Sequence, residues 1–167
     1  MTAYTTMTSP LGDLRLAGEE TATGITLTSL SLPGQKNAPA IQPGWREVPE
    51  LFEDVVGQLR EYFAGERTRF DIDFTEGGTE FQRRVWQAVD EFPFGSTTTY
   101  GSIADRLGLP RERIQAAAAA IGANPLLLVR PCHRVIGADG RMRGYAGGVE
   151  RKVQLLAHEG ALQPALL

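Results

Sequence analysis

The sequence predicts an α/β (more strictly α+β) protein of two parts, a small sheet with one covering helix followed by a helix-turn-helix unit. Apolar and polar residues alternate between positions 4 and 32, which is typical of strands, and apolar residues recur at helical spacing after Pro49. Two short helical segments joined by a glycine-containing turn follow position 100. Because Gly77-Gly78 interrupts the pattern between these parts, we predict two domains, 1–77 and 78–167.

The first domain is predicted to contain a three-stranded meander, a helix and one more strand. The turn at 9–12 and Gly24 separate the strand segments of residues 4–32. An amphipathic helix is expected to begin at Pro49 and to end at Gly65. Residues 70–74 alternate phenylalanine and isoleucine with aspartate, which predicts a strand with one wet face. None of these segments carries recognisable chemistry.

The second domain opens with the capping box Thr79-Glu80-Phe81-Gln82, which predicts the start of a helix. Trp86 lies at a buried position of that helix. An indole can also stack on bases, but the helical register favours core packing.

The helix-turn-helix is predicted to start with a brief helix that Ser102 caps and to continue in a second helix over 111–121. The outward face of this second helix carries Gln115, Ala116 and Ala119, so it is nearly bare of bulk. Two interpretations stay open with equal weight. The helix either packs tightly against a neighbour or approaches a narrow groove of DNA closely.

Cys132, the only cysteine of the chain, stands next to His133, one of only two histidines. A buried strand over 126–129 is predicted to lead into the pair, and adjacent residues of a strand point in opposite directions. The imidazole would therefore act on the thiol through a bridging water, with Glu159 near the end of the last helix orienting it. A Cys–water–His–Glu relay would supply a thiolate when an electrophile is presented.

Composition limits the function classes. Residues 1–77 carry 6 basic and 12 acidic side chains and residues 78–167 carry 11 and 8, so a polyanion would meet the second part. One cysteine and two histidines argue against a metal site, and no cofactor is expected. The single cysteine cannot form an intramolecular disulfide and would stay a reduced thiol inside the cell, and no apolar stretch reaches bilayer length. These features predict a soluble, cytoplasmic protein.

The segment Pro131-Cys132-His133-Arg134-Val135-Ile136-Gly137 resembles the active-site signature of the O6-alkylguanine-DNA alkyltransferases, the methylated-DNA–protein-cysteine methyltransferases. Comparable features of that family fall on Tyr100, Gly122-Ala123-Asn124-Pro125, Tyr145-Ala146-Gly147-Gly148 and His158-Glu159-Gly160. The resemblance is specific over about 79–160 and weaker before it. It implies a ribonuclease-H-like N-terminal domain and a helix-turn-helix (winged-helix-like) C-terminal domain.

The resemblance implies a single-turnover DNA repair protein. Cys132 would take the alkyl group of O6-alkylguanine irreversibly, after the base has been flipped out of the duplex. His133 would be the general base and Glu159 its orienting partner. Tyr100, or another proton donor nearby, would protonate the departing guanine, and Asn124 would tie the helix-turn-helix to the active-site strand.

The implied partner is double-stranded DNA, entered from the minor groove and carrying O6-alkylguanine. The protein would be a monomer that clusters on DNA, with no membrane partner. Arg134 would hold the active-site loop. The residues expected to contact the base or the DNA are Tyr145, Ala146, Gly147, Val135, Gln115, Arg111, Arg113 and Lys152.

Two positions depart from the family pattern. Gln115 stands where the family carries a base-extruding arginine, so either Gln115 or one of the neighbouring Arg111 and Arg113 is expected to fill the gap left by the base. Arg130 stands where the family has an apolar residue. Arg130 would favour a thiolate if it lies near Cys132, but a water-facing surface position is the preferred interpretation.

Two other function classes are open to such a chain. A non-catalytic binder of alkylated bases, or a helix-turn-helix regulator, would not need the cysteine that this chain retains. A cysteine hydrolase is disfavoured by the adjacent cysteine and histidine and by the lack of a recognisable oxyanion site.

Overall fold

The computed structural model describes residues 1–75, 77–142 and 144–162. The chain forms two compact units. The first contains Met1–Gly77 and the short segment Pro125–Val129, and the second contains Gly78–Asn124 and the chain from Arg130 on. The mixed α/β class predicted from the sequence is confirmed. The return of Pro125–Val129 to the first unit was not anticipated.

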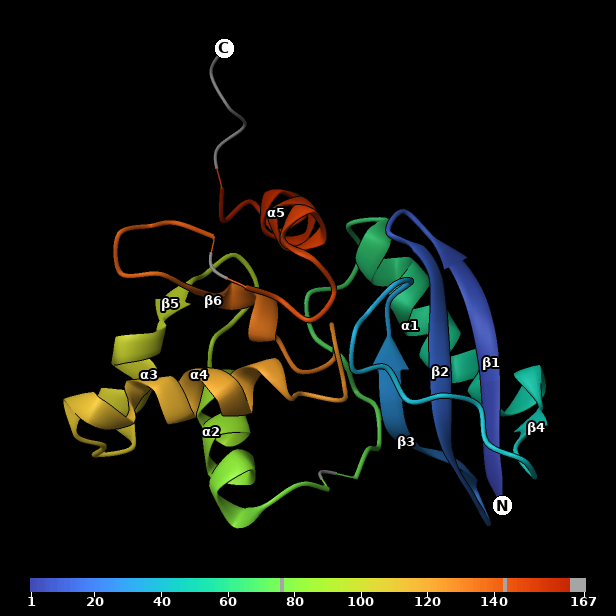
Figure 1. Cartoon of the computed structure of the whole chain (residues 1–167). Coiled ribbons are helices and arrows are strands. Elements are labelled where there is room, and N and C mark those ends of the chain that lie inside the picture. Colours follow the sequence, from blue (N-terminus) through green and yellow to red (C-terminus); the bar gives the residue numbers. More distant parts are fainter. Residues whose placement is uncertain (76, 143, 163–167) are drawn as a thin grey trace. The chain divides into compact units, whose positions relative to one another are not determined.

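The first unit is built on a four-stranded sheet of order β3-β2-β1-β4. The predicted meander is confirmed. It consists of β1 (Thr2–Ser9), β2 (Gly12–Thr21) and β3 (Gly24–Ser31), and each strand pairs antiparallel with the next one in the chain (Figure 1). No pattern in the sequence predicted β4 (Arg46–Glu47), which pairs parallel to β1 over two residues. A bulge between Ala17 and Gly18 brings the Gly18 Cα close to the Thr26 carbonyl, where any Cβ would clash at 2.4 Å.

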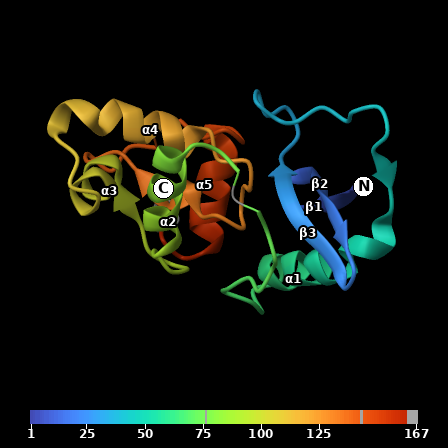
Figure 2. The same ribbon diagram turned by 90° about the horizontal axis from the view of Figure 1, so that it is seen from below.

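A helix covers one face of this sheet. The 3₁₀ turn η1 (Pro49–Phe52) leads into α1 (Glu53–Phe63), which runs along the sheet in both views (Figures 1 and 2). Its apolar stripe is buried, and buried Gln58 exchanges two hydrogen bonds with the backbone of Asp71. The strand predicted over 70–74 is wrong except for one bridge between Phe74 and Leu27, because the backbone of Asp71 bonds to that glutamine instead of to a neighbouring strand.

The second unit begins with α2 (Glu80–Asp90), and its predicted capping box is confirmed. The Thr79 hydroxyl accepts from the Gln82 amide, and the Gln82 side chain accepts from the Thr79 amide. Trp86 is buried, and its Nε1 donates to the Ala120 carbonyl at 2.8 Å. The indole is therefore a core residue that joins two helices, as the helical register predicted.

The helix-turn-helix consists of α3 (Tyr100–Arg106), the 3₁₀ turn η2 (Arg111–Arg113) and α4 (Ile114–Gly122). The N-cap of α3 is Thr99, whose hydroxyl accepts from the Ser102 amide, so the predicted Ser102 cap is wrong by three residues. Gly108 has φ +68° in the turn between the helices, a conformation that glycine adopts without strain. Helix α4 packs on α2 and α3 through its alanine-rich face.

The active-site segment lies between α4 and the last helix. Cys132–Arg134 form the 3₁₀ turn η3, and β6 (Val135–Ile136) pairs parallel with β5 (Thr98–Thr99). The last helix is α5 (Val149–His158), which carries Lys152, Leu155 and Leu156 on its buried side. No helix among the described residues is long and apolar enough to cross a membrane.

Candidate active site

Cys132 sits at the start of a tight turn and not at the end of a strand. The predicted strand over 126–129 is wrong, because this segment makes only one bridge, Leu126 to Leu30, and Leu128 adopts φ +70°. Pro131, at the N-cap, then leads into η3, which bends the backbone. The geometry that would point Cys132 and its neighbour to opposite faces of a strand therefore does not apply.

His133 and Glu159 form a buried pair. Their side chains are almost completely inaccessible, and His133 Nε2 lies 2.7 Å from Glu159 Oε2. An ionised carboxylate only accepts hydrogen bonds, so Nε2 carries the proton and Nδ1 is left as an acceptor. The tertiary structure thus assembles the pair expected from the sequence, although 26 positions separate its members.

Arg134 completes the anchoring of Glu159. Its guanidinium donates to both carboxylate oxygens, at 2.8 Å and 3.1 Å, and to the Phe92 carbonyl at 2.6 Å. This forked geometry holds a carboxylate in one orientation. It also explains how a glutamate is tolerated at the C-cap of α5, where the helix dipole disfavours negative charge.

Burial governs the protonation states at the site. Burial raises the pKa of the Cys132 thiol to about 12, against the lowering influence of Arg130, Asn124 and Lys152. Burial also lowers the pKa of His133, while the hydrogen bond and the charge of Glu159 act in the opposite direction. At neutral pH the resting pair is therefore a neutral thiol beside a neutral imidazole that can accept a proton.

Asn124 connects the end of α4 to the active-site turn. It is buried, and its Nδ2 donates to the Arg130 carbonyl at 3.3 Å. A hydrogen bond from the Asn124 side chain also lowers the pKa of Cys132. This hydrogen bond therefore joins the two residues that flank Pro125–Val129, the segment that belongs to the first unit.

Arg130 is buried, so the preferred expectation of a water-facing side chain is wrong. Its relative exposure is 1%, and its guanidinium makes two contacts with the Asp90 carboxylate, at 3.2 Å and 3.0 Å. The guanidinium carbon also lies 5.2 Å from the centre of the Trp86 ring. The buried charge is tolerated because a carboxylate and an aromatic face receive it, and both come from α2.

A pocket of about 780 Å³ opens over Cys132. Its wall combines residues from α3 and α4, Cys132 itself and the loop segments that follow the turn, and most of them are small. Of the predicted site residues it brings together Tyr100, Gln115, Cys132, Tyr145 and Ala146.

Tyr100 and Lys152 lie one above the other at this pocket. The Lys152 ammonium stands 5.8 Å from the centre of the Tyr100 ring and 3.4 Å from the Gly144 carbonyl, which the Tyr100 hydroxyl also contacts. Burial lowers the pKa of Lys152 to about 8. A lysine on a helix is ordinarily exposed to solvent, so no pattern in the sequence indicated that Lys152 is fully buried.

The candidate DNA-contacting side chains of the helix-turn-helix divide into two groups. Gln115 is exposed and lines the pocket. Arg111 and Arg113 are exposed on η2 and are not among the residues that line it, and Arg113 packs over the Phe81 ring. Of these three side chains, only that of Gln115 lines the pocket.

Val135 and Gly147 are both buried beside the turn. Val135 pairs with Thr98 in the small second sheet, and the Gly147 carbonyl accepts from Arg151. The backbones of both residues are thus engaged by other parts of the second unit.

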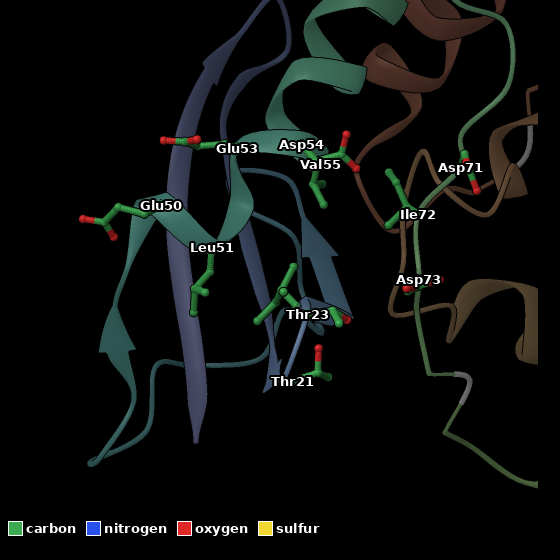
Figure 3. A pocket seen from close by; sticks show the side chains of 12 residues that line it. Thr21, Thr23, Glu50, Leu51, Glu53, Asp54, Val55, Asp71, Ile72 and Asp73 are labelled. Carbon is green, nitrogen blue, oxygen red and sulfur yellow. The ribbon is translucent and has the colours of Figure 1, made fainter.

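A second pocket, of about 530 Å³, belongs to the first unit (Figure 3). Acidic side chains from η1 and α1 and from residues 71–73 surround it, together with Thr21 and Thr23. Among the described residues there is no group of three or more histidine, cysteine or acidic side chains arranged to hold a metal ion. We assign no site here.

Comparison with known proteins agrees with this architecture. Residues 2–75 match the ribonuclease-like domain of 6-O-methylguanine DNA methyltransferase, and residues 80–161 match its DNA binding domain. A methylated-DNA–protein-cysteine methyltransferase of Mycolicibacterium paratuberculosis is 47% identical over the whole chain and 98% of the relative. One of Methanosarcina acetivorans is 40% identical, over 95% of this chain and 98% of the relative.

Solved structures show the same relationship. The crystal structure of Mycobacterium tuberculosis OGT in complex with DNA superposes with a TM-score of 0.86 and is 43% identical, covering 98% of this chain and 96% of that one. The fold is that of a DNA alkyltransferase. The chain belongs to the 6-O-methylguanine DNA methyltransferase family.

Asp90 and the depth of Lys152 are the features that sequence reasoning missed. Asp90 is the last residue of an amphipathic helix, where an acidic side chain is usually solvated, and its partner Arg130 follows 40 positions later. The one available signal was the arginine itself, because a charge next to a buried turn requires a partner.

Proposed function

We propose that this protein repairs alkylated DNA by direct reversal, transferring the alkyl group from O6 of guanine to Cys132. The observation that carries the proposal is the position of Cys132 in the wall of an open pocket, next to a histidine that is paired with a buried glutamate. The family relationship supports the same reaction.

The chemistry is an in-line displacement. The Cys132 sulfur attacks the alkyl carbon, an S–C bond forms, and the C–O6 bond breaks with its electrons going to guanine. The thioether has no leaving group that water displaces readily, so each molecule acts once. In this reaction the protein's own nucleophile is consumed as the second substrate, so the proposed chemistry calls on no cofactor.

Deprotonation of Cys132 has to be coupled to the attack. With a pKa near 12, the thiol is almost entirely protonated at neutral pH. His133 accepts the proton through a water at Nδ1, and Glu159 stabilises the resulting imidazolium. Arg134 keeps the carboxylate oriented. The site thus offers a nucleophile without exposing a reactive thiolate between encounters.

The departing guanine needs a proton. The Tyr100 hydroxyl lines the pocket, and the Lys152 ammonium stands over its ring, which favours a phenolate-like charge during proton donation. We assign Tyr100 as the proton donor and Lys152 as the residue that supports it. Direct contact of Lys152 with DNA is not part of the proposal, because its side chain is fully buried.

The DNA approaches through the face of α4 that carries Gln115 and Ala119, both exposed. Small side chains let the helix enter the minor groove closely, and the target base is flipped into the pocket because its O6 substituent cannot be attacked in line within a stacked duplex. Gln115 takes the space that the base leaves. Arg111 and Arg113 contact backbone phosphates, which accords with the net positive charge of residues 78–167.

The flipped base is held by the loop and strand around the turn. Tyr145 and Ala146 line the pocket, and the fixed backbones of Gly147 and Val135 present hydrogen-bonding groups to the edge of the base. Asn124 transmits the position of α4 to the turn that carries Cys132.

The two units divide the work in this proposal. Residues 78–167 bind DNA and carry out the reaction, and residues 1–77 form a ribonuclease-like domain that supports them. The protein acts as a monomer that clusters along DNA, and its location is the cytoplasm, where its substrate lies.

Intact-mass measurement tests the reaction. After incubation with duplex DNA containing O6-methylguanine, the protein is expected to gain one methyl group on Cys132, with no turnover beyond one equivalent. The Cys132→Ser variant should bind the same DNA and gain no mass. DNA binding by the wild type without any adduct would instead support the alternative of a non-catalytic binder of alkylated bases.

A further inference from the structure

Two buried polar atoms beside Cys132 have no hydrogen-bond partner among the described residues. They are His133 Nδ1 and the Tyr145 hydroxyl oxygen. A buried polar atom without a partner destabilises the folded state, and most such atoms in folded proteins are satisfied by protein or by ordered water. Two of them next to one nucleophile therefore point to a shared partner.

The two atoms belong to neighbouring rings. The rings of His133 and Tyr145 meet edge to face, with centroids 6.5 Å apart and planes at 79°. Because Nε2 is engaged by Glu159, Nδ1 lies on the other side of the imidazole. Tyr145 also lines the pocket that opens over Cys132, and burial raises the pKa of its hydroxyl.

We propose that Tyr145 is a positioning residue, whose hydroxyl donates to the same water molecule that links Cys132 Sγ to His133 Nδ1. The inference rests on the proposed alkyl transfer and deepens it. Besides lining the pocket, Tyr145 then has a role for its hydroxyl group. Its hydroxyl now supplies the third hydrogen bond of the relay water, the number that buried waters typically make.

The proton count balances through this water. In the resting state its oxygen accepts from the Cys132 thiol and from the Tyr145 hydroxyl, and one of its hydrogens goes to His133 Nδ1. During attack the thiol proton passes to the water and a water proton passes to Nδ1, while the S–C bond forms and the C–O6 bond breaks. The water then donates to sulfur and accepts from the imidazolium. Tyr145 donates in both states and keeps the water in line.

The charge states of the surrounding groups fit these roles. Tyr145 keeps its proton at neutral pH because its pKa is raised, so it is a donor. Burial lowers the pKa of His133, and the charges of Arg134 and Lys152 lower it further, whereas Glu159 acts in the opposite direction; the ring therefore stays neutral and Nδ1 is an acceptor.

The test compares Tyr145→Phe with wild type in single-turnover transfer at saturating methylated DNA. Phenylalanine keeps the ring against His133 and removes only the hydroxyl, so the protein should unfold at an unchanged temperature. We expect about a tenfold slower transfer with unchanged DNA affinity, the effect of losing about 1.4 kcal/mol of transition-state stabilisation. Tyr4→Phe, in the first unit, is the matched control for removing a phenol.

A double-mutant cycle separates relay water from other roles. If the hydroxyl acts through the water, removing it in a His133→Gln background should change the rate less than twofold. The same tenfold loss in both backgrounds would overturn the proposal, as would an unchanged rate in Tyr145→Phe alone.

Alkylation of Cys132 by iodoacetamide gives a readout that needs no DNA. At pH 7.5 the wild type should react about tenfold faster than Tyr145→Phe, and the difference should vanish in the His133→Gln background. Equal reactivity of the wild type and Tyr145→Phe would contradict the shared water. If the wild type transfers no alkyl group from DNA, the proposed function fails, and this comparison still decides whether the tyrosine positions the relay.

Discussion

Glu159 holds His133 and Arg134 at once: Oε2 lies 2.7 Å from the imidazole Nε2, and Oε1 lies 2.8 Å from the guanidinium Nε. One carboxylate thus fixes the imidazole of His133 and, through Arg134, the turn that carries Cys132. Because all three side chains are buried, their geometry is set by the fold and not by solvent.

Replacement of Glu159 by Gln should damage both stability and transfer. The amide keeps the shape but leaves Arg134 as a buried charge without its counter-ion, which costs about 3–5 kcal/mol. The transfer rate should fall about 100-fold, since general-base catalysis contributes about 10²–10⁴-fold. Urea unfolding and single-turnover assays measure the two effects. Glu112→Gln, at an exposed position of η2, should change neither.

Stability should decline on acidification because of His133. Its pKa in the folded protein is lowered below the ordinary value of 6.5, so the unfolded chain binds the proton more readily. The stabilisation is therefore complete above pH 6.5 and is lost as the pH falls below that value. Urea unfolding between pH 7.5 and 5 should show a steeper loss for wild type than for His133→Gln. Parallel pH profiles of the two proteins would contradict the buried neutral imidazole.

The Arg130–Asp90 pair predicts a non-additive pair of substitutions. Asp90→Ala leaves a buried guanidinium beside Trp86 and should cost about 3–5 kcal/mol. The double variant Asp90→Ala with Arg130→Met removes both charges and should recover most of that loss. Denaturant unfolding of the single and double variants measures the coupling. Equal destabilisation by both would mean that the ion pair does not account for the burial of Arg130.

Gln115 should influence base extrusion and not only DNA affinity. It is exposed and lines the pocket. Gln115→Ala is expected to slow transfer at saturating DNA about tenfold, because no side chain then fills the gap in the duplex. Gln115→Arg should transfer faster than wild type, since a cation interacts favourably with the displaced stack and the phosphates. Gln87→Ala on α2 is the control. An unaltered rate in Gln115→Ala would remove the glutamine from this role.

Much of the fold followed from local patterns. The meander, the helix after Pro49 and the capping box at Thr79 are short-range features whose physical causes lie within a few residues. The pairing of Cys132 with His133 was visible in the same way, because the two are adjacent in the chain. The strands predicted at 70–74 and 126–129 were wrong, because each segment forms only one isolated bridge with a neighbouring strand and the Asp71 backbone bonds to a side chain instead.

From the sequence alone, Cys132 is predicted as the nucleophile and His133 as its general base, and the motif around them indicated the family that the comparisons confirm. Only the tertiary structure decided that Arg130 is buried and pairs with Asp90, that Lys152 lies over the Tyr100 ring, and that the Tyr145 ring meets the His133 ring edge to face. Each of these relationships joins residues that are distant in the chain, and whether a charge or a hydroxyl is buried depends on which elements pack over it. The pKa values that control the reaction depend on that burial, so no local pattern could supply them.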